Sequence, residues 1–211
     1  SIATASSRGL DELMGDTDLS IGQDLVMPES TLSDRESTEA MRSVLNMVDS
    51  SHFETRVEGA RILCDLSASN VNHVTLCHVG CLAAIAKLLR GHAQGYGLAA
   101  AQAAAVALAH LSESACCQDE IINAGLLPEL LRLAVDSSYL MSDMSEACAL
   151  AISNLCRQRA ERVVGAMKGA DRDLLSRWIT SVDEVENQQL KMRIGIARDG
   201  LLGCNAIGTL L

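Results

Sequence analysis

The sequence predicts an all-α solenoid built from three to four similar helical units. Two observations support this prediction: a set of positions recurs about every 44 residues, and the apolar residues are mostly small or unbranched. Hydrophobic residues make up 48% of the 211 residues, yet aromatic residues make up only 2%. Alanine and leucine are among the best helix formers, whereas sheet proteins favour aromatic and β-branched residues. The composition therefore favours closely packed helices and argues against a disordered chain.

Three segments carry the repeat and align without gaps. They begin at Ala60, Ala105 and Ala149, so the period is 45 and then 44 residues. In each segment a leucine follows six residues after the alanine, and a glycine follows fourteen residues after that leucine. The recurring positions are Leu66, Leu111, Leu155 and Gly80, Gly125, Gly169. Glycine suits a helix junction because helices often end on a residue with positive φ. Each unit lacks the apolar surface to fold alone, so we expect the units to stack and share a core.

The chain is predicted to have three regions. Residues 1–33 form an acidic extended arm, residues 34–200 form the helical repeats, and residues 201–211 form a tail. Within the first 35 residues, seven acidic residues stand against two arginines, a composition typical of weakly structured segments. From residue 34 onward, apolar residues are spaced by three and four, as on one face of a helix.

Two segments resemble the armadillo repeat family. The run from Ile122 to Ala134, INAGLLPELLRLA, is similar to that family's junction between its short first helix and its second helix. The run from Ala149 to Cys156, ALAISNLC, is similar to its third helix. The resemblance covers about residues 35–182 and implies a right-handed superhelix. A HEAT-like array is the nearest alternative, above all at the two ends.

The resemblance also places each expected helix. First helices are expected near 70–79, 114–124 and 158–168. Second helices are expected near 35–49, 81–90, 126–135 and 170–181. Third helices are expected near 52–67, 95–112 and 139–156, with a degenerate one near 184–199. The stretch between Gly97 and Leu111 is the most apolar and is expected to be a buried helix.

The third helices of armadillo proteins line a concave groove, and the resemblance implies that partners bind there. The alternative is an ordinary solvated helix face. The candidate groove residues of this chain are Arg61, Asp65, Gln102, His110, Glu146 and Asn154. The importin-alpha branch reads basic peptides with a Trp and an Asn four residues apart on each third helix. Here the Trp positions hold Arg61, Val106 and Leu150, so lysine stems have no aromatic shelf and we do not expect recognition of a nuclear signal.

A cluster of His73, Cys77, His78 and Cys81 is the one metal-like pattern. We interpret it as packing, because the positions that match Cys77 and Cys81 in the next repeat hold Ile122 and Leu126. The eight cysteines mostly lie in apolar helical stretches, where free cysteine behaves as a small hydrophobe. We expect reduced thiols in the cytosol or the mitochondrial matrix, and not a secreted protein.

We expect no enzymatic activity, no cofactor and no catalytic residue. No serine lies in a Gly-x-Ser-x-Gly setting, and there is no phosphate-binding Gly-rich loop with lysine. The net charge of −10 disfavours nucleic acid and anionic membranes as partners. We expect a protein-protein interaction scaffold, most simply a structural subunit of a hetero-oligomeric assembly. A free adaptor that binds an extended peptide in its groove is the alternative. The chain begins at Ser1, which fits a processed chain or a fragment.

Overall fold

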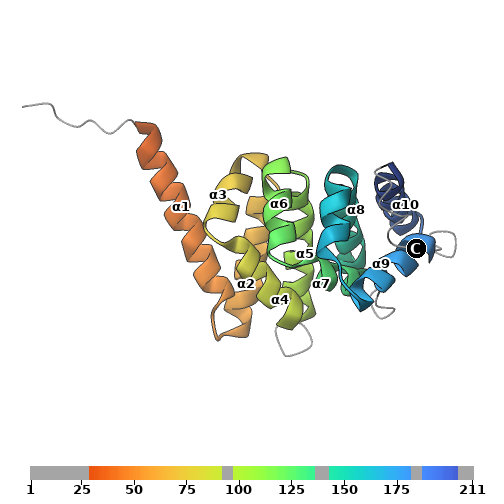
Figure 1. The fold of residues 1–211 in the computed structure, drawn as a ribbon. Coiled ribbons are helices and arrows are strands. Elements are labelled where there is room, and N and C mark those ends of the chain that lie inside the picture. Colours follow the sequence, from red (N-terminus) through yellow and green to blue (C-terminus); the bar gives the residue numbers. More distant parts are fainter. Residues whose placement is uncertain (1–28, 92–96, 136–142, 182–186, 204–211) are drawn as a thin grey trace, which may run out of the picture.

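The computed structural model describes residues 29–91, 97–135, 143–181 and 187–203, with only the backbone of residues 29–34. Within these ranges every regular element is helical (Figure 1). The predicted arm lies mostly in residues 1–28, outside the described part, while residues 29–33 belong to the first helix. Most of the predicted tail also lies outside it, and the last helix includes residues 201–203.

The helices follow the predicted repeat order, and units stack side by side along the molecule (Figure 1). The second-helix positions hold α1 (Glu29–Val48), α4 (Cys81–Gly91), α7 (Leu127–Val135) and α9 (Ala170–Thr180). The third-helix positions hold α2 (Phe53–Ser67), α5 (Leu98–Ser112), α8 (Asp143–Ala166) and α10 (Gln188–Gly203). The first-helix positions hold η1 (Asn70–Asn72) with α3 (His73–His78), and α6 (Ala115–Asn123). The expected all-α repeat architecture is therefore confirmed.

The third repeat lacks a separate first helix. Instead α8 continues past the third-helix segment and changes direction at Arg159, whose φ of −137° and ψ of 31° are not helical. The break lies close to the predicted boundary between helices 139–156 and 158–168. The part of α8 beyond Arg159 therefore takes the place that α3 and α6 have in the other repeats.

Glycines mark the junctions between first and second helices, as predicted. Gly80, Gly125 and Gly169 have φ values of 89°, 67° and 49°. A side chain would strain the backbone in this left-handed region, so glycine recurs at the same point of each repeat.

The core runs continuously through the stacked units, and α5 lies at its centre. This helix packs against α2, α4 and α8, and most of its alanines and leucines are buried. The predicted burial of this apolar stretch is confirmed. Alanine side chains are short, so neighbouring helices can approach α5 closely without leaving cavities.

Both ends of the array rely on a glycine where two helices touch. A Cβ on Gly59 would lie 2.8 Å from Cβ of Met47 in α1. A Cβ on Gly200 in α10 would lie 2.7 Å from the carbonyl oxygen of Cys156 in α8. Real Cβ atoms do not come this close to other heavy atoms, so only glycine allows α1 and α10 to pack as they do.

No single helix of the described residues is long and apolar enough to cross a membrane. One pair, Asn70–His78 with Cys81–Gly91, reaches that length and hydropathy only in combination and is bent by 86°.

Candidate functional site

The third helices α2, α5 and α8 pack in consecutive contact and carry the candidate residues at matched positions. Side chains four and eight residues apart lie on one face of an α-helix. Nine residues occupy these positions, and we call them the third-helix face. They are Val57, Arg61 and Asp65 on α2, Gln102, Val106 and His110 on α5, and Glu146, Leu150 and Asn154 on α8.

Solvent access varies over this face. Arg61 and Asp65 on α2 are exposed, whereas Asn154 on α8 retains only 6% of its surface. Gln102, His110 and Glu146 are half-buried. The three apolar members are also half-buried and pack against the core below. The face therefore combines exposed charge at the α2 end with a partly sunken, polar and apolar surface toward α8.

A serine at the end of α2 fixes the imidazole of His110. Ser67 Oγ donates to the carbonyl oxygen of Cys64 at 2.6 Å and lies 3.0 Å from Nδ1 of His110. The hydroxyl has one hydrogen, and the carbonyl takes it. Nδ1 of His110 must therefore carry the hydrogen in the second bond. When the ring is neutral, its Nε2 is then an acceptor.

The next repeat has the same arrangement with an asparagine. Ser112 Oγ donates to the carbonyl oxygen of Ala109 at 2.6 Å and accepts a hydrogen bond from Nδ2 of Asn154 at 3.0 Å. Ser67 and Ser112 hold matched positions, as do His110 and Asn154. We call each of these two sets a serine relay. Both relays join neighbouring third helices at one edge of the face.

The opposite edge of the face is joined in a similar way. Gln102 donates from Nε2 to Oδ2 of Asp143 at 2.9 Å, which links α5 to α8. Asn187 donates from Nδ2 to Oε1 of Glu146 at 2.8 Å. Oδ1 of Asn187 also accepts from the backbone N–H groups of Gln189 and Leu190, so it caps the start of α10. On α2, by contrast, Arg61 pairs with Glu58 of its own helix, at 3.5 Å.

Solved structures that match this chain include designed armadillo repeat proteins, in agreement with the fold described above. No family model and no curated protein matches the sequence. Among solved structures, computationally designed armadillo repeat proteins for modular peptide recognition match with a TM-score of 0.63 at 15% identity, over 83% of this chain and 76% of that one. A designed armadillo repeat protein in complex with the peptide (KR)4 matches with a TM-score of 0.59 at 14% identity, over 88% of this chain and 85% of that one. An engineered protein matches with a TM-score of 0.60 at 17% identity, over 81% of this chain and 68% of that one.

The chain has an armadillo-type repeat fold. In this frame the six candidate residues all lie on the third helices of the first three armadillo repeats. Five of them have accessible surface, and Asn154 is an internal link between two repeats.

The metal-like cluster of the sequence has a structural role in the armadillo array. His73 is buried, and its Nε2 donates to the carbonyl oxygen of Ser67 at 2.7 Å, while its Nδ1 bonds Ser114 at the start of α6. Gln118, at the matched position of the next repeat, donates to the carbonyl oxygen of Ser112 at 2.9 Å. Each side chain therefore donates a hydrogen bond to a backbone carbonyl group in the last turn of a third helix, which has no partner within the helix itself. Among the described residues no three His, Cys, Asp or Glu are placed to hold a metal ion.

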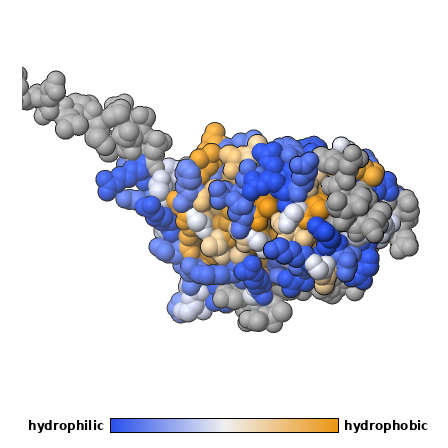
Figure 2. Space-filling view, in the orientation of Figure 1, coloured by the Kyte–Doolittle hydropathy of each residue, from blue (hydrophilic) through white to orange (hydrophobic). Residues whose placement is uncertain are grey.

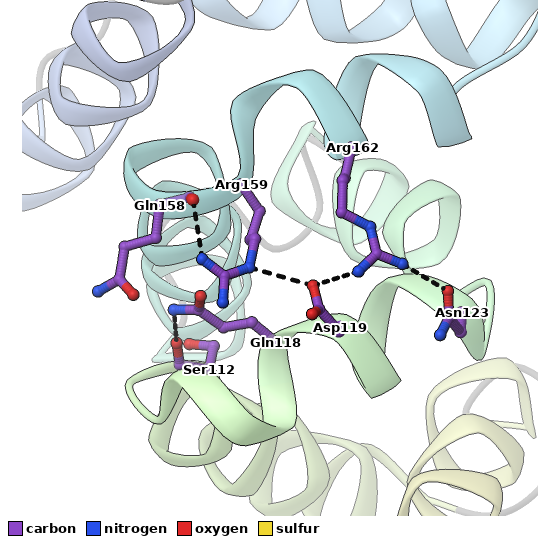
Figure 3. Close-up of polar contacts among 7 residues, drawn as sticks. All are labelled: Ser112, Gln118, Asp119, Asn123, Gln158, Arg159 and Arg162. Carbon is purple, nitrogen blue, oxygen red and sulfur yellow. Dashed lines mark hydrogen bonds and ion pairs between the residues drawn. The ribbon is translucent and has the colours of Figure 1, made fainter.

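An acidic residue on α6 links the second and third armadillo repeats, and sequence reasoning missed it (Figure 3). Asp119 accepts from Nε of Arg159 at 3.1 Å and also pairs with Arg162. Arg162 in turn donates to Oδ1 of Asn123 at 3.0 Å. The two arginines follow Asp119 by about one repeat length, which is the signal that could have revealed the contact. The network holds the bent part of α8 against α6.

Proposed function

We propose that this chain is a non-enzymatic armadillo scaffold that binds a segment of a partner protein along its third-helix face. The single observation that supports this best is the pairing of an accessible apolar strip with polar side chains that are already held in place. Val106 and Leu150 lie half-buried in the middle of the face, between edges that are hydrogen-bonded from repeat to repeat.

Held side chains favour binding for an entropic reason. Ordering a free rotamer-rich side chain on binding costs roughly 0.5–1.5 kcal/mol. His110 and Glu146 are already bonded to neighbouring helices, so a partner loses less free energy when it contacts them. The neutral ring of His110 offers Nε2 as an acceptor, which suits a backbone or side-chain N–H of the partner.

The chemistry of the face suggests the partner. Val106 and Leu150 fit apolar side chains, whereas Arg61, Asp65 and Glu146 bring both signs of charge. We infer an extended segment that alternates apolar and polar residues. A run of lysines and arginines, such as the peptide bound to one of the designed armadillo proteins, fits poorly. The one tryptophan of the chain, Trp178, is 4% exposed in α9 and cannot form an aromatic shelf.

We propose further that the partner is a stable neighbour in a hetero-oligomeric assembly, in a reducing compartment such as the cytosol or the mitochondrial matrix. Polar edges that are fixed in advance suit a permanent interface more than a surface that must adapt to many peptides. All seven cysteines of the described residues are free thiols, which agrees with a reducing environment.

The test is gel filtration of a native extract from cells that express a tagged form of this chain. We expect the wild type to elute in a complex much larger than its own 22.4 kDa. A double variant, Val106→Gln with Leu150→Gln, should elute free, because it removes the apolar strip. The matched control, Val71→Gln, changes a valine of η1 that is 85% exposed and should stay in the complex.

The results separate the alternatives. Elution of the wild type at its own mass would refute membership of a stable assembly and would favour a free adaptor. A peptide array probed with the wild type and with the double variant would then identify the peptides that the third-helix face binds. Retention of the double variant in the complex would refute the third-helix face as the binding site. Circular dichroism of each purified variant establishes that loss of binding is not loss of folding.

A further inference from the structure

Two thiols from neighbouring armadillo repeats lie against each other on the side of the array that carries the first helices. Cys77 is in α3 and Cys117 is in α6, and their sulfur atoms are 3.0 Å apart. Cys117 also bonds the carbonyl oxygen of His73 at 3.5 Å, which fixes its direction. A disulfide bond is about 2.05 Å long, so a movement of about 1 Å would bring the two sulfurs to bonding distance.

A cavity gives small reagents a path to this pair. It has a volume of about 190 Å³ and is lined by six residues of α3 and α6. They are Val74, Cys77, His78, Cys116, Cys117 and Glu120. Cys77 is half-buried, whereas Cys117 is fully buried. Of the two thiols, that of Cys77 is therefore the more accessible to a reagent.

We propose that Cys77 and Cys117 form a reversible oxidation site, in which a low-molecular-weight disulfide converts the two thiols into a cross-link between the first and second repeats. The thiolate of Cys77 attacks one sulfur of oxidised glutathione, so a mixed disulfide forms and one glutathione leaves as the thiolate. The thiolate of Cys117 then attacks the sulfur of Cys77 and releases the second glutathione. The two protons lost by the cysteines end on the two glutathione thiols, and a reducing glutathione pool reverses both steps.

The neighbouring Cys116 does not take the place of Cys77 in this pairing. Its sulfur lies 3.8 Å from that of Cys117, and both residues stand next to each other on α6. A bond between adjacent residues of a helix would distort the helix, whereas a bond from α3 to α6 only draws two packed helices together. Cys116 is exposed and is therefore a site of simple modification.

The thiols of the pair are not activated as those of catalytic dithiols are. The hydrogen bond to Cys117 lowers the pKa of Cys77. The hydrogen bond to Cys81 and burial together raise it by more, so the pKa of Cys77 rises to about 12. The bond to Cys77 and burial raise the pKa of Cys117 as well. The titratable groups that face the pair are His78, Cys81, Cys116 and Glu120. Since only the thiolate reacts, the exchange is slow at neutral pH and speeds up about tenfold per unit of pH.

The cross-link has a mechanical consequence for the array. Each unit of a solenoid contacts only its neighbours, so the terminal unit can separate on its own. A covalent bond between α3 and α6 holds the first repeat to the second and prevents that separation. Oxidation would thus preserve the part of the third-helix face that α2 and α5 share, although the cross-link itself does not depend on the proposed function.

The test uses the reduced full-length chain, incubated with oxidised glutathione at pH 8.5. After acid quenching and alkylation in denaturant, intact mass and peptide mapping identify the bonds. We expect the loss of two hydrogen atoms, a link from Cys77 to Cys117, and a rise in Tm of roughly 5 °C or more. Cys116→Ser should keep the link and the rise in Tm. Cys77→Ser should abolish both, and circular dichroism must show that it folds.

Three results would overturn the proposal. They are a chain that takes up glutathione without an internal bond, a bond between Cys116 and Cys117, and a bond to Cys117 that persists in Cys77→Ser. If Cys77→Ser does not fold, Cys77→Ala and the Cys117→Ala variant take its place, and formation of the same Tm shift in either would be equally decisive against it.

Discussion

The packing of the last armadillo helix can be tested with one substitution made at two places. Gly195 and Gly200 are both in α10, and both are replaced by alanine. A Cβ on Gly195 would have no heavy atom within 4 Å. A Cβ on Gly200 would lie 2.7 Å from the carbonyl oxygen of Cys156 and 3.0 Å from Cα of Arg157. The two variants therefore share their effect on helix formation and differ in their contact with α8.

The expected free energies follow from these two terms. Alanine stabilises the middle of a helix by about 0.5–1 kcal/mol relative to glycine, so Gly195→Ala should raise the free energy of unfolding by that amount. Gly200→Ala gains the same amount but pushes α10 away from a backbone group, and overpacking of this kind costs about 1–3 kcal/mol. We expect a net loss of up to about 2.5 kcal/mol. Because the two variants share the gain in helix formation, they should differ by the overpacking cost alone, about 1–3 kcal/mol, or roughly 2–12 °C in Tm for a chain of this size.

Urea denaturation followed by circular dichroism at 222 nm measures the free energies, and calorimetry measures Tm. Equal stabilisation by the two substitutions would refute the close approach of α10 to α8. Destabilisation by both would refute the helical state of α10 itself. Only stabilisation by Gly195→Ala together with destabilisation by Gly200→Ala agrees with α10 as a third helix that continues the array.

Three further predictions concern the interior of the array. Asn154→Ala should lower the free energy of unfolding by about 1–3 kcal/mol in urea denaturation, because it removes the buried donor to Ser112; a loss below 0.5 kcal/mol would contradict the serine relay. Asp119→Asn should cost about 1 kcal/mol in low salt and much less in 1 M NaCl, because its arginine partners are partly exposed; an effect that salt leaves unchanged would contradict an ionic link. Burial raises the pKa of both Cys148 and Cys156 to about 12. Their folded pKa values lie above the unfolded value of about 9, so the stability that each thiol contributes is full below pH 9 and is lost as the pH rises from 9 toward 12, by roughly 1 kcal/mol per unit of pH. Replacing both by alanine should flatten this slope in urea titrations at each pH.

The repeat pattern predicted most of the fold because each recurring residue has one local physical cause. Gly80 and its counterparts mark the junctions that need positive φ, and Leu66 and its counterparts mark the last turn of each third helix. These causes act within a few residues, so they can be recognised from sequence spacing. The start of α1 at Glu29 was not predicted, since serines, threonines and charged residues there give no apolar periodicity.

The contacts between repeats could not be predicted in the same way. Whether Ser67 meets His110 depends on how far each repeat rotates relative to the next, and spacing along the chain does not specify that rotation. The structure brings four of the six candidate residues into bonds with a neighbouring helix and leaves Arg61 and Asp65 exposed on α2. The sequence thus predicted which residues lie on the third-helix face. It did not predict which of them form hydrogen bonds to a neighbouring helix.

The serine relays also explain why the last repeat differs from the others. At the position of Ser67 and Ser112, the third repeat has Cys156, which lacks a hydroxyl group and is fully buried. At this point α10 places Gly200 close to the carbonyl oxygen of Cys156, where a Cβ would lie 2.7 Å from it. Hydrogen bonds between side chains join α2, α5 and α8. Helices α8 and α10 meet through the close contact at Gly200 and through Asn187, which caps α10 and donates to Glu146. The hydrogen-bonding side chains of the third-helix face are therefore held in place on α5 and α8, and α10 covers the core beside α8.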